Sequence, residues 1–168
     1  HCRLKPIITD NYVSLGQLTA LRFLEWVCEN PGGVIALPTG KTPEFFIKWT
    51  QFYLANWNRE LNKGILAEIG FKKNARPDMK SLEFFQLDEF FPIHPAHERS
   101  FSNFINLFYI KGFGLDRRKA HLINTCEMRD RKDINLCELF SDGDIDLSLR
   151  TRQVKSEKEL QKKRAIQY

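Results

Sequence analysis

The sequence predicts an α/β fold, in which short apolar strands form a parallel sheet flanked by helices. Three observations lead to this prediction. Segments with helical periodicity alternate with short, wholly apolar runs, which is the pattern of βαβ units. A glycine-containing turn joins the first such run to the next helix. Hydrophobic residues make up 42% of the 168 residues, enough to fill a core, and this excludes a wholly disordered chain.

The first helices and the first strand are marked by periodicity and by end signals. Residues 14–29 carry leucines at helical spacing, with Ser14 as the candidate N-cap, and the Asn-Pro-Gly-Gly run at 30–33 ends the helix. Residues 34–37 are all apolar, as expected of a fully buried parallel strand. A second helix is predicted over 43–56, because its proline suits the first helical position.

The rest of the chain continues the alternation of helices and strands. Residues 124–150 are charged and receive no assignment, and no internal repeat or linker divides the chain into two domains. The expected order places all strands in one Rossmann-like parallel sheet. The remaining elements are predicted as helices at 61–69, 99–110 and 154–168, and strands at 82–87 and 120–123.

The positive charge is concentrated near the last residue. Residues 151–168 contain six basic and two acidic residues, so they carry +4 (6 − 2) of the net charge of +5. We interpret this segment as a solvated helix face, because helix formers there carry charges at helical spacing. The alternative is a nucleic-acid-binding tail, but no RNA-binding motif accompanies it, so a nucleic-acid partner is not expected.

Membrane and secretory classes are not indicated. No apolar run reaches the roughly 18 residues that a membrane span requires, and no signal-like segment opens the chain. No two cysteines form a CxxC pair, and their spacing matches no zinc module. We therefore predict reduced thiols in a cytoplasmic protein, with Cys28 as part of the core. The four cysteines are Cys2, Cys28, Cys126 and Cys137.

No metal site is expected. His94, His97 and Glu98 follow neither the HExxH nor the HxxEH pattern, and a proline interrupts them, so we predict that they are loop residues. His121 is expected to be a core or edge histidine of a strand. The run Asp142–Asp146 lacks the ligand spacing of an EF-hand loop.

The segment Thr39–Pro43 is the first candidate site. A glycine turn between a strand and a helix N-terminus presents backbone N–H groups that favour an anion, and here threonine hydroxyls and a lysine are added. The letters Gly-Lys-Thr resemble a nucleotide P-loop, but that motif needs a glycine at position 35, where Ile35 stands. The turn is therefore predicted to bind a phosphate outside the P-loop class, with a plain turn as the alternative.

Asp88 is the second candidate residue. It directly follows the apolar run that ends at Leu87, so it lies at the carboxyl end of a predicted strand, where open parallel sheets bind ligands. A carboxylate beside a phosphate-binding turn suits proton transfer on a phosphorylated substrate, with Asp88 as general base. The alternative is that Asp88 caps the following loop.

Taken together, the motifs resemble those of the glucosamine-6-phosphate deaminase/isomerase family. That family has an LPTGGTP-type turn, an MDEY-type strand end and a helix that opens with an HPxSY-type sequence. Their order and intervals agree over residues 34–124, whereas the related 6-phosphogluconolactonases carry a serine-rich turn and a DER-like acidic motif. The matching segments are LPTGKTP at Leu37–Pro43, LDEF at Leu87–Phe90, HERSFSNFINLFYI at His97–Ile110 and GLDRRKAHLIN at Gly114–Asn124.

The resemblance implies a substrate and a reaction. These enzymes convert glucosamine 6-phosphate to fructose 6-phosphate and ammonia by ring opening, aldose–ketose isomerisation and loss of the amine, without a cofactor. By match with the family motifs, Asp88 would be the base that moves the proton at C2, and its neighbour Glu89 has no assigned catalytic role. The residues implied in phosphate binding are Thr39, Gly40, Lys41 and Thr42.

The resemblance also implies that part of the family domain is missing. The family's GGxGxDGHIAFNEP-type segment, which carries the residues used for ring opening, does not occur, and Lys41 replaces the second glycine of the turn. His1 stands where a start methionine would be. We expect residues 1–168 to form the N-terminal part of a deaminase-like domain that is inactive alone.

Two other functions remain open. One is a non-catalytic sugar-phosphate-binding or regulatory domain, and the other is a 6-phosphogluconolactonase-like hydrolase. A small phosphosugar is the expected partner in the leading hypothesis, and a homo-oligomer is compatible with the sequence.

Overall fold

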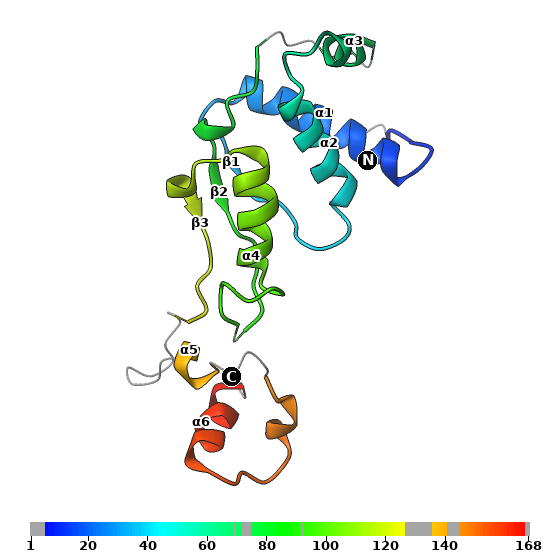
Figure 1. Ribbon diagram of the computed structural model, residues 1–168. Coiled ribbons are helices and arrows are strands. Elements are labelled where there is room, and N and C mark those ends of the chain that lie inside the picture. Colours follow the sequence, from blue (N-terminus) through cyan, green and yellow to red (C-terminus); the bar gives the residue numbers. More distant parts are fainter. Residues whose placement is uncertain are drawn as a thin grey trace, which may run out of the picture.

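A parallel sheet flanked by helices forms the centre of the computed structural model, which describes residues 6–68, 70–71, 75–91, 93–126, 136–140 and 145–166. Within these residues the sheet has three strands in the order β1-β2-β3 (Figure 1). Ile35 pairs with Phe84, and Phe84 pairs with Ala120. The predicted α/β class is thereby confirmed. The strands are β1 (Val34–Ile35), β2 (Glu83–Phe85) and β3 (Ala120–His121).

The helices follow the predicted order with small shifts at their ends. The helix predicted over 99–110 is two segments, α4 (Phe101–Ile105) and a π-helical continuation (Asn106–Lys111), which together run alongside the strands in Figure 1. Short 3-10 turns occupy Met79–Ser81, Arg117–Lys119 and Leu147–Arg150. The α-helices are α1 (Tyr12–Glu29), α2 (Glu44–Ala55), α3 (Glu60–Glu68), α4 (Phe101–Ile105), α5 (Leu136–Leu139) and α6 (Glu157–Ile166).

The N-cap of α1 corrects the sequence prediction. The cap is Asn11, not Ser14, and the Asn11 side chain accepts a hydrogen bond of 2.9 Å from the Ser14 backbone N–H. Asparagine and serine are both good caps, so composition alone did not distinguish the two positions. Cys28, predicted as core, is only half-buried.

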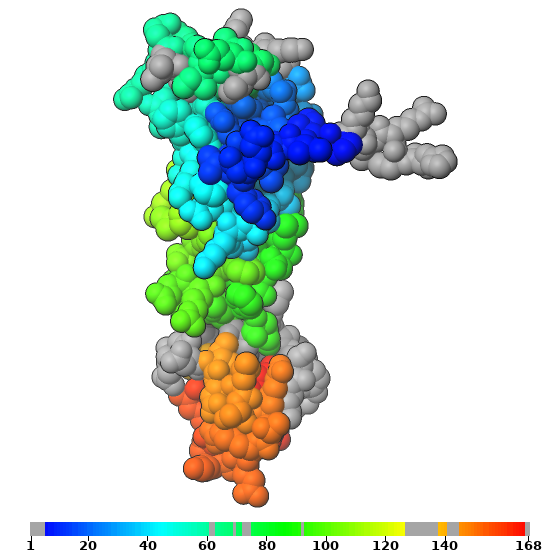
Figure 2. All heavy atoms as spheres, turned by 90° about the vertical axis from the view of Figure 1, so that its right-hand side faces the viewer, coloured from blue at the N-terminus to red at the C-terminus, as the bar shows by residue number. Residues whose placement is uncertain are grey.

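The main core lies between the sheet and helices α1, α2 and α4. Tyr53, Tyr109, Phe84 and Leu24 are almost completely buried there. Helices α1 and α2 approach closely at Gly16, where a Cβ atom would lie 2.4 Å from the Cβ of Phe45. The space-filling view shows α1 (blue) against the turn and α2 (cyan) on one side of the molecule (Figure 2).

The sheet buries only one of its faces among the described residues. Ile35, Phe84 and Ala120 point into the core, whereas Val34 and Phe85 are 63% and 44% exposed. This corrects the prediction of a fully buried strand over 34–37. Side chains alternate across a strand, and the helices described here lie over one side only, so every second apolar residue remains exposed.

The C-terminal residues form a second, smaller core. It consists of Leu139, Phe140, Leu149 and Ile166, separate from the main cluster. The predicted terminal helix is present as α6. Part of the positive charge near the last residue is paired, because Arg152 forms ion pairs with Glu159 at 2.8 Å and with Asp146 at 3.2 Å.

Two sequence predictions on thiols and membranes can be compared with the structure. Cys126 is disulfide-bonded, so the expectation of reduced thiols is wrong at this residue. Cys28 remains a thiol, and its Sγ lies 3.5 Å from the carbonyl oxygen of Ala75. The side chains of Cys2 and Cys137 lie outside the described residues. Within the described part of the chain, no helix is long and apolar enough to cross a membrane.

Candidate functional site

The turn at Thr39–Thr42 connects β1 to α2, as the sequence predicts. Gly40 has φ of +93°, a conformation that favours glycine, and a Cβ there would meet no atom within 4 Å, so the backbone is open to an approaching ligand. Pro43 occupies the N-cap position of α2 and not the predicted first helical position, and in the described part of the chain no side chain caps this end of the helix at Pro43. The first turn of α2 therefore lacks the capping group that usually satisfies its N–H donors, which is compatible with an anion there.

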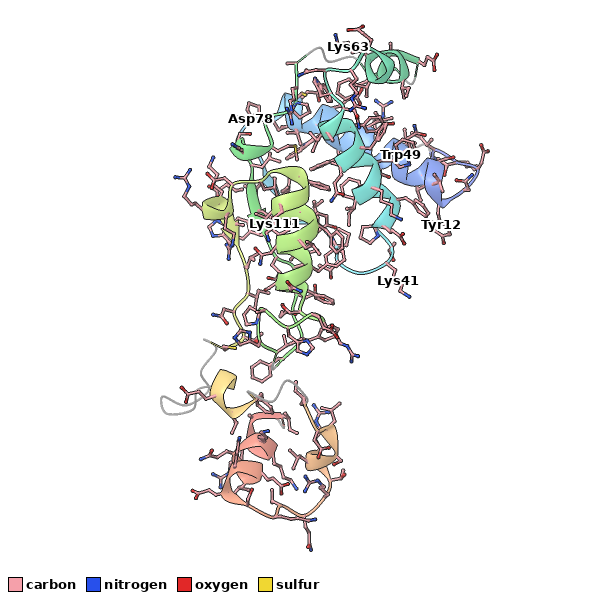
Figure 3. All side chains as sticks on the ribbon, viewed as in Figure 1. Tyr12, Lys41, Trp49, Lys63, Asp78 and Lys111 are labelled. Atoms are coloured by element: carbon pink, nitrogen blue, oxygen red, sulfur yellow. The ribbon has the colours of Figure 1, made fainter. Side chains whose placement is uncertain are left out.

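Lys41 and Lys48 supply positive charge beside this turn. The side chain of Lys41 extends from the end of the loop away from the ribbon, so it does not cover the backbone of the turn (Figure 3). Lys48 pairs with Glu44 at 2.5 Å. The hydrogen bond and charge of Lys48, with a smaller contribution from Lys41, lower the pKa of Glu44, which stays ionised and paired.

Two cavities lie on either side of the turn. The larger one, of about 420 Å³, is bordered by Gly40 and Lys41 of the turn, by the outward face of α2 and by the aromatic rings of the α4 segment. The second, of about 310 Å³, lies between the turn and α1 and is mostly apolar. The larger cavity is lined by Gly40, Lys41, Glu44, Ile47, Lys48, Gln51, Phe104 and Phe108.

Asp88 follows the carboxyl end of β2, the strand beside β1. Its side chain is exposed, and within the described residues it makes no hydrogen bond or ion pair. It lines neither of the two cavities described above. The turn and Asp88 thus follow the ends of two adjacent parallel strands, which is the arrangement expected from the sequence.

Glu89 has a structural role that the sequence did not reveal. Its carboxylate accepts hydrogen bonds of 2.8–2.9 Å from the Ser100 hydroxyl and from the backbone N–H groups of Phe101 and Ser102. Burial alone would raise the pKa of Glu89, but these donors together lower it below its ordinary value. The ionised carboxylate therefore binds the first N–H groups of α4 from a preceding loop, beside the N-cap residue Ser100. No local spacing could have indicated this pairing.

Gln86 fixes the backbone at Asp88. Its Oε1 accepts hydrogen bonds from the Ser102 hydroxyl and the Ile123 N–H, both 2.9 Å long, and its Nε2 donates to the carbonyl oxygen of Asp88 at 2.7 Å. Gln86 is 8% exposed, so its amide is held on both sides by packed structure. The position of Asp88 is consequently coupled to α4 and to the segment after β3.

His94, His97 and His121 take part in local structure. The Nδ1 atoms of His94 and His97 lie 3.1 Å from the backbone nitrogens of Ala96 and Arg99 as acceptors, in the predicted loop. His121 is on β3, where it stacks on Phe85 at 4.3 Å, which agrees with the prediction of an edge histidine. Within the described residues, no group of three His, Cys, Asp or Glu side chains could hold a metal ion.

Comparison with known proteins identifies a sequence relative and several solved structures of similar fold. The chain is 25% identical over 122 residues to a glucosamine-6-phosphate deaminase of Clostridium tetani (strain Massachusetts / E88), covering 72% of this chain and 43% of that protein. It shares the fold of a monomeric glucosamine-6-phosphate deaminase of the NagB superfamily, with a TM-score of 0.59 and 16% identity over 83% of this chain and 51% of the other. No family model matches. The chain thus spans about half the length of the proteins it resembles.

Proposed function

Because the chain is related in sequence and fold to glucosamine-6-phosphate deaminases, we propose that it binds the phosphate of an amino-sugar phosphate at Thr39–Thr42. In the complete protein, Asp88 would be the general base that moves the proton at C2 during aldose–ketose isomerisation. Ammonia release from glucosamine 6-phosphate would follow from that isomerisation. The observation that carries this proposal is the open glycine turn at the uncapped N-terminus of α2.

The electrostatics of the turn support an anionic ligand. Lys41 and Lys48 both border the larger cavity, and the single acid there, Glu44, is already paired with Lys48. A phosphate at the turn would therefore meet backbone N–H groups and the Lys41 ammonium group with little repulsion from Glu44. At about 420 Å³ the cavity is within the size range of ligand pockets, which begin at about 300 Å³. Asp88 lies outside its lining, so a sugar whose phosphate is bound at the turn would extend beyond the cavity to reach this base.

The two adjacent acids differ in what they can do chemically. Asp88 is exposed and has no partner among the described residues, so its carboxylate is available to accept a proton. Glu89 is engaged by donors that stabilise its charge, and protonation would disrupt the N-terminus of α4. This contrast favours Asp88 over Glu89 as the base.

A second candidate function is phosphosugar binding without turnover. The 168 residues contain no DGH segment of the kind that the resemblance associates with ring opening, and Lys41 replaces a glycine of the turn. For this chain by itself we therefore propose binding alone, and we propose turnover only where the missing catalytic residues are supplied.

Calorimetric titration of the chain with glucosamine 6-phosphate tests the binding site. We expect saturable binding that is lost with unphosphorylated glucosamine and weakened by Lys41→Met, because the substitution removes the charge and keeps most of the length. Lys63→Met, which removes an exposed lysine of α3, is the matched control and should leave the affinity unchanged. Equal affinity for the sugar with and without its phosphate would contradict the proposal.

Ammonia release by the complete protein tests the role of Asp88. Asp88→Asn should lower kcat by at least about 100-fold, since a positioned general base typically contributes 10²–10⁴. Equal turnover of the two proteins would rule out Asp88 as the base. Turnover by the wild-type protein would also exclude the non-catalytic alternative.

A further inference from the structure

Tyr109 connects the core to the candidate phosphate turn. It lies in the π-helical segment after α4, is 0% exposed, and packs against Phe84 at 5.9 Å and Phe113 at 5.2 Å. Its hydroxyl donates a hydrogen bond to the carbonyl oxygen of Pro38, the residue before Thr39. Nothing in the sequence resemblance assigns a role to this tyrosine.

The hydrogen bond from Tyr109 is suited to hold the turn. Burial raises the pKa of the Tyr109 phenol, so the hydroxyl keeps its proton and remains a donor at neutral pH. Pro38 has no backbone N–H, so its carbonyl is the one backbone group through which this residue can be anchored. Three packed rings fix the direction of the hydroxyl, because Phe84, Phe104 and Phe113 surround the Tyr109 ring.

The turn has few other restraints. Beyond β1, which ends at Ile35, the remaining hydrogen bonds of residues 36–43 run to the start of α2: Glu44 N–H donates to Lys41, and Ile47 N–H donates to Pro43. Within the part of the chain that the structure describes, the Tyr109 hydroxyl makes the one hydrogen bond that ties residues 36–43 to an element distant in sequence.

We infer that Tyr109 is a positioning residue for the phosphate-binding turn, and this inference rests on the function proposed above. Its hydroxyl holds Pro38, and thereby the backbone N–H groups of residues 39–42, in place before the ligand arrives. Tyr109 lines neither cavity, so it acts through the turn and does not contact the phosphosugar. Preorganisation of this kind improves affinity by avoiding the cost of ordering the loop on binding.

The chain offers a matched pair of substitutions for the test. Tyr109→Phe removes the hydroxyl and keeps the ring. Tyr53→Phe does the same at another tyrosine that is 0% exposed. Its hydroxyl accepts a 2.9 Å hydrogen bond from Gln17 and, within the described residues, makes none with the turn. Both variants lose one buried tyrosyl hydrogen bond, so a general loss of stability should affect them alike.

We expect Tyr109→Phe to weaken glucosamine 6-phosphate binding about fivefold to tenfold in calorimetry, the effect of one hydrogen bond. Tyr53→Phe should change affinity less than about twofold. Unchanged affinity in Tyr109→Phe, or an equal loss in both variants, would overturn the inference.

Backbone ¹⁵N relaxation of the ligand-free protein separates this inference from the proposed function. Tyr109→Phe should lower the order parameters of residues 39–42 relative to both wild type and Tyr53→Phe. If wild type binds no phosphosugar, the proposed function fails, and the order parameters still decide whether Tyr109 holds the turn. Equal order parameters in the two variants would refute that role whatever the binding result.

Discussion

Replacing Glu89 by glutamine should separate the structural acid from the candidate catalytic one. The carboxylate receives three donors at the start of α4. A glutamine keeps one acceptor oxygen and turns an NH₂ group toward the remaining donors. It therefore loses at least the bond from Phe101 N–H and the charge that strengthens the others, and the free energy of unfolding should decrease.

The expected loss can be worked from these bonds. A hydrogen bond to a charged acceptor contributes about 1.5–3 kcal/mol. Because Glu89 is partly exposed, we expect about 2 kcal/mol in total for Glu89→Gln. For a chain of this size, each kcal/mol shifts Tm by roughly 2–4 °C, so Tm should decrease by about 4–8 °C.

The pH dependence of Tm provides a second test of the hydrogen bonds to Glu89. The pKa of Glu89 is lowered in the folded state, so its contribution to stability is complete above the unfolded value of about 4.3 and is lost as pH falls through the lower folded pKa. The difference in Tm between wild type and Glu89→Gln should therefore be largest at pH 6 and shrink toward pH 3. Thermal unfolding followed by circular dichroism measures both effects.

Asp88→Asn is the internal control for this experiment. It alters the neighbouring acid, which is exposed and has no partner in the described part of the chain, so its Tm should remain within about 1–2 °C of wild type. The reasoning is refuted if Glu89→Gln unfolds at the wild-type Tm, or if its deficit persists unchanged at pH 3.

Three further substitutions and one control test the packing around the turn. Gly16→Ala would place its Cβ 2.4 Å from that of Phe45 and should lower the free energy of unfolding, measured in urea, by about 1–3 kcal/mol. Gly64→Ala, in open space on α3, is the control and should raise the free energy of unfolding by about 0.5–1 kcal/mol. An unchanged free energy of unfolding in Gly16→Ala would contradict the close contact. Thr50→Val removes a buried hydroxyl that has no hydrogen-bond partner among the described residues, and should raise the free energy of unfolding by about 1 kcal/mol. A decrease would show that the hydroxyl is satisfied. Gly40→Ala, at φ +93°, should cost about 1–3 kcal/mol and weaken phosphosugar binding in calorimetry; wild-type affinity would show that the turn tolerates a side chain.

The fold was predictable where the information is local. The apolar runs around Ile35 and Phe84 and the periodic helix after Ser100 carry their own signals, so order and type of the elements follow from the sequence. The sequence does not tell how many faces of the sheet are covered by helices. The exposure of Val34, for example, depends on which elements pack on the sheet.

The candidate site likewise has features that the sequence predicts and features that it does not. The turn at Gly40 and the acid Asp88 are recognisable from short motifs, although their chemical roles remain predictions. Their supports are not recognisable, because each acts over a long sequence separation. Glu89 contacts residues 11 to 13 positions away, and Gln86 contacts Ile123 across 37 positions. Only the folded chain brings such partners together.

The hydrogen bond between Tyr109 and Pro38 also affects the order in which the protein forms during synthesis. Its two residues are 71 positions apart, and a ribosome that adds about 5–20 residues per second needs roughly 4–14 s to cover that distance. During this interval β1, the turn and α2 have left the ribosome without their anchor. We therefore expect the candidate phosphate turn to be among the last parts of the main core to mature, and its phosphosugar affinity to reach the full value only after the segment after α4 has emerged.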